Sequence, residues 1–397
     1  MKAWICAWCL VSLVALGEQA ENGAVANAAS FFPIGIYGVN ATNDFAELKA
    51  AGFNLVVGRA ERSYLDAARA AGLKVLASPG TAAGPGFNEK AAAKAVRELD
   101  RHPALWAWYL VDEPDLAELP PEQVTRAHRL LKRLHARKPT ALVLFQGYEA
   151  LDYGNITDIL MLDRYPVPWL PLANFGQHVQ MARLALGKDK PLMAVIQAFD
   201  WNSCPELLPG IEHLRPPTYA EMRSMTYEAL ARGANGLFYY AFDDGRWKQR
   251  EHPETWNALK SIVREVNQRL PLFTAERQWW ARRHEFGAPT QRFNAALQSS
   301  VTSCRLRVPQ GNALIEPGDY ILAVNNTERE LQYSFALPLS PSDYSPLSTL
   351  HAQIIEVLGE NRSVSLEAGR VQDSFAPYAV HVYGPLHSSG GQSRQKP

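Results

Sequence analysis

A pair of acidic residues follows an apolar run in the first third of the chain. Residues 105–111 lead into Asp112, Glu113 and Pro114. The apolar surroundings predict a raised pKa for Glu113, and a carboxylic acid that stays protonated near neutral pH can serve as a general acid. Pro114 keeps the preceding backbone extended. Because side chains alternate along a strand, Asp112 is expected to face the opposite way as a supporting group, unless the strand has already ended and both side chains turn inward.

Polar residues recur wherever an apolar run of the first 245 residues ends. They are Tyr37, Arg59, Gln146, Asp163, Tyr165, Gln197, Asp200, Trp201, Tyr240, Asp243 and Asp244. Any one such carboxylate can simply cap a helix or hold a loop. Several that meet on one rim favour catalysis, and cleavage of a glycosidic bond needs two carboxyl groups, one to protonate the leaving oxygen and one to attack or to activate water. We expect Glu113 and Asp163 to be catalytic and the others, with Asp112, to bind substrate.

The elements that would position these residues alternate between short apolar runs and amphipathic segments from residue 31 to about 270. The expected strands are 32–39, 54–59, 74–78, 105–111, 141–146, 158–165, 192–199 and 236–242. The expected helices are 45–51, 64–71, 89–99, 121–136, 175–186, 219–232 and 253–269, with no more than a helical turn in 148–157. This alternation predicts an α/β fold, a (β/α)8 TIM barrel, in which functional groups gather at the C-terminal ends of the strands.

An open, doubly wound sheet is the rival fold. Such a sheet usually carries a glycine-rich phosphate turn after its first strand, and residues 35–38 do not form one. Beyond residue 285 the helical period stops and short alternating runs appear at 319–325, 331–337, 353–358, 364–366 and 379–383. We therefore expect a barrel domain at 29–284, a small antiparallel β-sandwich domain at 285–386 and a disordered tail at 387–397.

Composition narrows the class of partner. The chain is 47% hydrophobic and 20% charged, as in globular proteins with a large core, and 40 basic residues balance 40 acidic ones. Because no net charge draws the chain to nucleic acid or to an anionic membrane, an oligo- or polysaccharide without charge is the expected partner. The sequence shows no zinc spacing and no nucleotide or flavin signature, so neither metal nor cofactor is expected. It predicts no oligomeric state.

The first residues predict export. A lysine at position 2 and the apolar run 3–16 have the form of a secretory signal peptide, which we place at residues 1–28, and beyond it no apolar stretch approaches the roughly 20 residues of a membrane helix. A secreted or periplasmic protein is expected. Cys204 and Cys304 remain after cleavage, and they either pair in the oxidising compartment or stay free and partly buried.

Three segments resemble a known group of enzymes. Asp112-Glu113-Pro114 resembles the Asn-Glu-Pro signature of clan A of the glycoside hydrolases, in which the glutamate is the acid/base. Residues 223–240 are similar to the last helix and strand of related bacterial barrel hydrolases, and residues 373–383 resemble their C-terminal sandwich. The resemblance implies a bacterial glycosidase with Glu113 as its acid/base, without identifying a numbered family.

One position departs from that pattern. Clan A enzymes place a nucleophilic glutamate at the end of strand seven, where this chain has Gln197, and an amide cannot form a covalent glycosyl intermediate. Asp200 could act in a shifted register, Asp163 could be the second carboxylate, or an inverting enzyme could use Asp163 or Asp244 as its base. We favour Asp163, which follows the apolar run 159–162. The alternatives are a carbohydrate-binding barrel that has lost its nucleophile and another hydrolase or lyase on the same fold.

Overall fold

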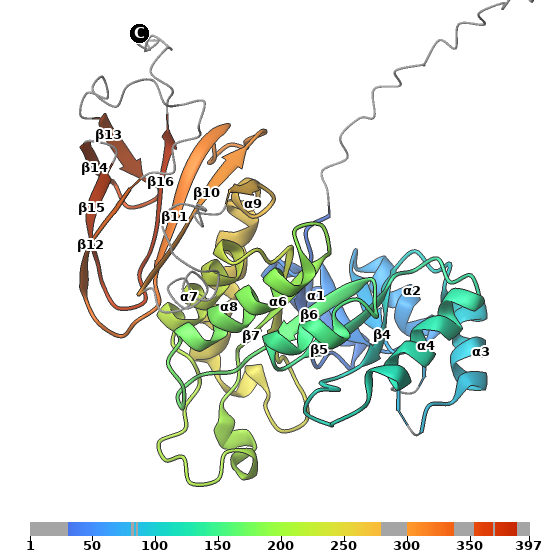
Figure 1. Ribbon diagram of the computed structural model, residues 1–397. Coiled ribbons are helices and arrows are strands. Elements are labelled where there is room, and N and C mark those ends of the chain that lie inside the picture. Colours follow the sequence, from blue (N-terminus) through green and yellow to red (C-terminus); the bar gives the residue numbers. More distant parts are fainter. Residues whose placement is uncertain are drawn as a thin grey trace, which may run out of the picture. The chain divides into compact units, whose positions relative to one another are not determined.

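The computed structural model describes residues 31–80, 83–84, 86–278, 300–336, 353–367 and 370–386. The expected signal peptide and tail lie outside these residues. Eight parallel strands close into a barrel in sequence order, with β8 paired to β1. Helices surround the strands (Figure 1). The predicted TIM barrel is confirmed.

The strands of the barrel are short. They are β1 (Ile34–Ile36), β2 (Leu55–Gly58), β3 (Lys74–Ala77), β4 (Leu105–Val111), β5 (Thr140–Leu144), β6 (Ile159–Asp163), β7 (Leu192–Gln197) and β8 (Gly236–Tyr240). Every residue of β5, β6 and β7 is buried, because helices cover the outside of the barrel and side chains fill its inside. All eight expected strands are present, and most end earlier than expected because the polar residues after them already belong to loops.

The main helices of the barrel are α1 (Phe45–Ala51), α2 (Arg62–Ala70), α3 (Glu89–Leu99), α4 (Pro121–Arg133), α6 (Ala173–Leu186), α7 (Tyr219–Ala231) and α8 (Pro253–Gln268). The weak fifth connection holds a 3-10 turn (Gly147–Glu149) and the single turn α5 (Ala150–Tyr153), as expected. Gly52 ends α1 with φ 103°, a left-handed conformation that favours glycine and lets β2 follow after two residues. A short helix, α9 (Leu270–Phe273), follows α8.

The C-terminal strands pair in an antiparallel sheet with the order β12-β15-β14-β13-β16-β11-β10-β9. Their bounds are β9 (Glu276–Gln278), β10 (Val301–Val308), β11 (Gly318–Asn325), β12 (Leu331–Ala336), β13 (Gln353–Val357), β14 (Arg362–Glu367), β15 (Arg370–Phe375) and β16 (Val380–Leu386). Both halves of the sheet contribute to one core, where Ile321 of β11 joins Val357 of β13 and Phe375 of β15. Figure 1 shows the two halves as facing layers, which confirms the predicted sandwich.

Helix α7 is buried on most of its surface because it lies between the barrel and this sheet. The Thr302 hydroxyl of β10 accepts a hydrogen bond from Arg232 at 2.7 Å and donates one to Glu228 at 2.7 Å. Arg223 donates to the carbonyl oxygen of Val380 at 3.3 Å. A polar network thus joins the barrel to the C-terminal sheet at α7. Cys204 and Cys304 are both free and buried.

Candidate active site

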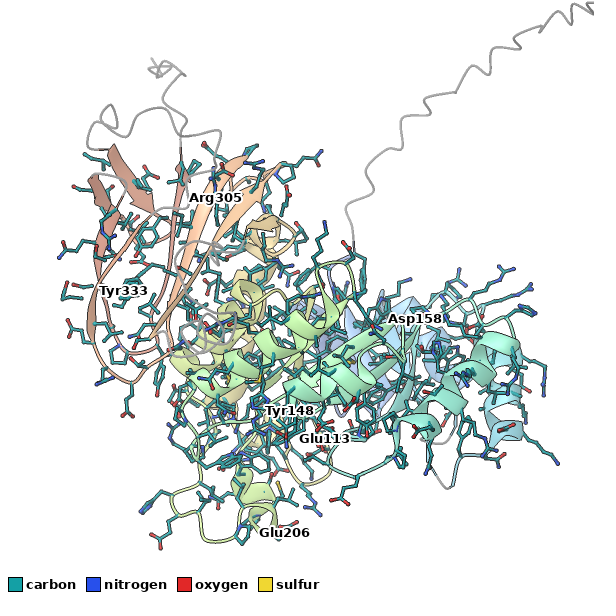
Figure 2. All side chains as sticks on the ribbon, viewed as in Figure 1. Glu113, Tyr148, Asp158, Glu206, Arg305 and Tyr333 are labelled. Atoms are coloured by element: carbon teal, nitrogen blue, oxygen red, sulfur yellow. The ribbon has the colours of Figure 1, made fainter. Side chains whose placement is uncertain are left out.

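The backbone at the end of β4 brings two carboxyl groups into the mouth of the barrel. Glu113 has φ 40°, a left-handed conformation that interrupts the alternation of the strand, so the expectation of an extended backbone before Pro114 is wrong. Asp112 accepts a hydrogen bond from the Tyr109 hydroxyl, and its charge raises the pKa of Glu113. The expectation that Asp112 faces away from Glu113 is therefore wrong, because the strand ends at Val111 and both side chains turn inward. Figure 2 shows Glu113 at the opposite end of the barrel from Asp158, which precedes β6.

Glu113 is coupled to Asp163, the last residue of β6. Burial, followed by the charge of Asp112, raises the pKa of Glu113 to about 7. Burial and the charge of Glu113 raise the pKa of Asp163 well above its ordinary value. The Asp163 side chain lowers the pKa of Glu113, whereas the Glu113 side chain raises that of Asp163. The two predicted catalytic residues are therefore neighbours in space.

Tyr165 holds the Asp163 side chain from the other direction. Its hydroxyl donates to Asp163 Oδ2 at 3.0 Å, and only 5% of Asp163 is exposed. Asp163 Oδ1 is buried without a hydrogen-bond partner among the described residues. The next residue, Arg164, faces the opposite side of β6, where its guanidinium lies 4.2 Å from the centre of the Phe145 ring.

Five aromatic side chains form one continuous surface beside the carboxyls, which we call the aromatic wall: Tyr37, Tyr165, Phe199, Trp201 and Tyr240. Neighbouring ring centres along it lie 4.9–5.6 Å apart: Tyr37–Tyr240 5.6 Å, Tyr240–Tyr165 5.6 Å, Tyr165–Phe199 5.2 Å and Phe199–Trp201 4.9 Å. Tyr37 continues the wall toward Asp112 through its hydroxyl, which donates to the Tyr109 hydroxyl at 3.4 Å. Four of these rings are more than nine-tenths buried, and Tyr240 is the partly exposed ring of the wall that can present an apolar face to a sugar.

Gln197, at the end of β7, is fully buried and hydrogen-bonded to backbone. Its Oε1 accepts from the amide of Val167 at 2.9 Å, and its Nε2 donates to the carbonyl oxygens of Val167 at 2.7 Å and Phe199 at 3.3 Å. An amide suits this position because it both donates and accepts, which an ionised carboxylate cannot do. Gln197 thus anchors the loop after β6.

The other rim aspartates hold turns. Asp200 accepts from the amide of Asn202 at 2.8 Å, and Asp243 accepts from the amide of Gly245 at 2.9 Å. Asp244 accepts from the amide of Trp247 at 2.7 Å and from the Tyr240 hydroxyl at 3.0 Å. Each of these carboxylates already has a structural task.

Two expected binding residues stand apart from the carboxyl cluster. The Arg59 side chain is exposed and pairs with Glu61 at 3.4 Å. Gln146 begins the turn after β5, where its amide donates to Asp115 at 2.8 Å. Among the residues that the structure describes, neither side chain forms a hydrogen bond or an ion pair with Glu113 or Asp163.

Tyr109 and Asp115 were not among the expected site residues. Tyr109 lies inside β4, whose pairing with β5 is irregular between Tyr109 and Val111. This irregularity shifts the alternation, so the face to which Tyr109 points could not be read from the period. Asp115 accepts from the amides of Phe145 and Gln146, and its charge contributes to the raised pKa of Glu113. In the sequence, the only feature that pointed to Tyr109 and Asp115 as site residues was their closeness to Glu113 along the chain.

Within the described ranges, no three His, Cys, Asp or Glu side chains form a group that could hold a metal ion. No helix in the same ranges has the length and apolar character needed to cross a membrane.

The fold defines a class: a (β/α)8 barrel followed by an antiparallel sandwich, an arrangement found in solved glycoside hydrolases. One is a glycoside hydrolase family 5 protein from Bacteroides vulgatus, with 13% identity, 89% of each chain covered and a TM-score of 0.54. Another is the α-amylase of Geobacillus thermoleovorans in complex with acarbose, with 9% identity, 89% of this chain and 97% of the other covered, and a TM-score of 0.52. At such identities the likeness shows the fold alone. No protein-family model matches the sequence, and no curated protein matches it either.

Proposed function

We propose that this protein is a secreted glycoside hydrolase that cleaves O-glycosidic bonds of a neutral glycan, with Glu113 as general acid/base and Asp163 as the second carboxyl. The coupled, buried pair of Glu113 and Asp163 at the C-terminal rim is the observation that carries the proposal. Strongly raised pKa values at a barrel rim are typical of catalytic acids. The fold of known glycoside hydrolases is consistent with it.

The two carboxyls have different roles in the proposed reaction. Glu113 has a pKa of about 7, so a large fraction holds a proton at neutral pH and can donate it to the leaving glycosidic oxygen. Asp163 is too deeply buried to meet the sugar directly, its raised pKa keeps it protonated, and Tyr165 fixes its orientation. Asp163 therefore serves as the positioning and proton-holding partner rather than as the attacking group.

A neutral glycan fits the surroundings of this pair. Burial and neighbouring acids are the largest contributions that raise the pKa values of Glu113 and Asp163. A uronic acid would add another negative charge to this cluster and would be repelled. The partly exposed Tyr240 of the aromatic wall instead offers stacking to uncharged sugar rings.

The test is hydrolysis of a panel of aryl glycosides and polysaccharides by the wild type, E113Q and D163N, with E122Q on the exposed surface of α4 as the matched control. We expect activity with at least one neutral substrate, unchanged in E122Q and reduced by about 100-fold or more in E113Q. D163N should lose activity and shift the pH profile. Equal turnover by wild type and E113Q would refute the role of Glu113.

A non-catalytic carbohydrate-binding barrel is the second candidate, and Gln197 in place of a nucleophile is the observation that favours it. If neither wild type nor E113Q cleaves any glycoside while calorimetry detects sugar binding, this second candidate replaces the first. The hydrogen bonds of Gln197 weaken it, because they give the amide a structural task independent of catalysis.

A further inference from the structure

The carboxyl groups of the site all come from one sector of the barrel. Asp112 and Glu113 follow β4, and Asp163 ends β6, with only β5 between these strands. The charge of Asp112 raises the pKa of both other acids. Two carboxyls that flank a glycosidic bond lie about 5–5.5 Å apart in retaining enzymes and about 6.5–9.5 Å apart in inverting ones. Glu113 and Asp163 lie side by side in this one sector rather than on opposite sides of the mouth.

The sector across the mouth has no carboxylate free to attack, among the residues that the structure describes. At the end of β7, Gln197 is fully engaged with backbone. Asp200, Asp243 and Asp244 accept backbone hydrogen bonds within their own turns. Displacement at the anomeric carbon requires attack from the side opposite the leaving oxygen. With Glu113 protonating that oxygen, the protein offers no opposing nucleophile.

Resting on the proposed function, we propose that the substrate is a β-linked 2-acetamido-2-deoxy hexoside, which carries its own nucleophile. The oxygen of its acetamido group attacks the anomeric carbon, and Asp112 accepts a hydrogen bond from the amide N–H. The acetamido group is trans to a β-linked leaving group and can reach the far face of the ring. Participation of this kind is an established alternative to a protein nucleophile in glycoside hydrolysis.

The position of Asp112 suits this task. Its carboxylate is exposed at the mouth and lies directly beside Glu113, so it can meet the substituent on the carbon next to the reacting one. The Tyr109 hydroxyl donates to Oδ1 and fixes the orientation, which leaves Oδ2 for the amide. Behind it, Asp163 Oδ1 is buried, with no hydrogen-bond partner in the part of the chain that the structure describes.

The steps balance. In the first, the amide oxygen forms a bond to the anomeric carbon, the glycosidic C–O bond breaks, Glu113 gives its proton to the leaving oxygen, and Asp112 takes the amide proton. The product is a neutral oxazoline. In the second step, Glu113 takes a proton from water and the water oxygen bonds to the anomeric carbon. The bond between the anomeric carbon and the oxazoline oxygen breaks, and Asp112 returns its proton to the oxazoline nitrogen. The sum is hydrolysis with retention of configuration.

A 2-hydroxyl group fits less well. Its oxygen would have to close a strained three-membered ring, whereas the amide oxygen closes a five-membered ring at high effective concentration. The acetyl methyl also has an apolar surface to contact at the partly exposed Tyr240, whose ring packs at a tilt against the rings of Tyr37 and Tyr165.

The experiment compares aryl 2-acetamido-2-deoxy-β-D-glucosides and galactosides with the corresponding 2-hydroxy glycosides on the whole protein. We expect kcat/KM to favour the acetamido series by at least about 100-fold. Fluorine in the acetyl group withdraws electrons from the amide oxygen, so kcat should fall steadily through the mono-, di- and trifluoroacetyl substrates. The anomer released first, followed by NMR, should be the retained one.

The variant D112N tests the role of Asp112, with D152N on the exposed side of α5 as its control. D112N should lower kcat on the acetamido substrates by about 100-fold or more while circular dichroism and the melting temperature stay near those of the wild type. Added azide should not restore the rate, because the nucleophile belongs to the substrate.

Preferred cleavage of 2-hydroxy glycosides, a kcat indifferent to fluorine, an inverted product, azide rescue of D112N or full activity of D112N would each overturn the inference and leave the glycosidase proposal standing. Absence of cleavage in both series, with cleavage of another substrate in the panel above, would overturn this inference alone, whereas absence of cleavage across the whole panel would refute the glycosidase proposal and this inference with it.

Discussion

Gln197 and Val167 are joined by a pair of hydrogen bonds between one side-chain amide and one backbone unit: Oε1 accepts from the Val167 amide at 2.9 Å, and Nε2 donates to its carbonyl oxygen at 2.7 Å. The pair ties the end of β7 to the loop that follows β6. The position where related barrel hydrolases place a nucleophile thus has a structural role in this chain.

We predict that Q197E creates no nucleophile and destabilises the protein. A glutamate would direct a carboxylate oxygen at the carbonyl oxygens of Val167 and Phe199, leaving buried groups without donors at a cost of roughly 1–3 kcal/mol each. Thermal unfolding should show a lower melting temperature than for wild type. A Q197E protein that is as stable as wild type and more active would contradict this view of the site.

The activity should fall on the alkaline side of pH 7. Since the pKa of Glu113 is about 7, its proton-donating form is lost above that pH, and kcat/KM should decline about tenfold per pH unit. A pH–rate profile from pH 4 to 9 on an active aryl glycoside checks this. A flat profile across pH 6–9 would show that Glu113 does not supply the proton, and E122Q should reproduce the wild-type curve.

Stability should also depend on the same acids. Glu113 and Asp163 have higher pKa values in the folded chain than their ordinary 4.5 and 3.8, so the folded state binds protons more tightly than the unfolded state. Their contribution to stability is fully present below pH 4 and is lost progressively as the pH rises through about 7. D163N and E113Q should therefore flatten this dependence.

Melting temperatures at pH 5 and pH 8 measure the effect. Relative to wild type, both variants should gain more at pH 8 than at pH 5, and E122Q should track the wild type at both. A wild type whose melting temperature rises from pH 5 to pH 8, with the two variants rising in parallel, would indicate that the two acids are not perturbed.

Asp100 should stabilise β4 from the end of the barrel opposite the site. Its carboxylate accepts hydrogen bonds from Trp108 Nε1 at 2.9 Å and from the amides of Arg137 and Lys138 at 2.6 and 3.1 Å. D100A leaves these donors unpaired, so we expect a loss of roughly 1–3 kcal/mol or more in the free energy of unfolding.

Urea denaturation measures the loss, and D152N, at an exposed position on α5, is the control. Activity per folded molecule should not change, because Asp100 precedes β4 while Glu113 follows it. If D100A lost activity per folded molecule, the substitution would have to alter the geometry at Glu113 through β4.

Local patterns determined much of this protein. Buried runs and glycine-capped helices were sufficient to predict eight βα units, because each depends on neighbours within a few residues and on burial. The rule that functional groups follow barrel strands then selected Glu113 and Asp163, which the structure brings together. The weak fifth connection was also predicted, and it holds one helical turn.

Tertiary structure decided the rest, because the remaining questions depend on backbone geometry and on distant partners. The left-handed backbone at Glu113 turned Asp112 into the mouth, against the alternation that the sequence suggested. Gln197 forms its hydrogen bonds with Val167, thirty residues away in the chain, and so anchors the loop after β6. The proximity of Glu113 to Asp163 required β4 and β6 to bring two carboxyls to one sector of the mouth, and no residue pattern encodes that distance.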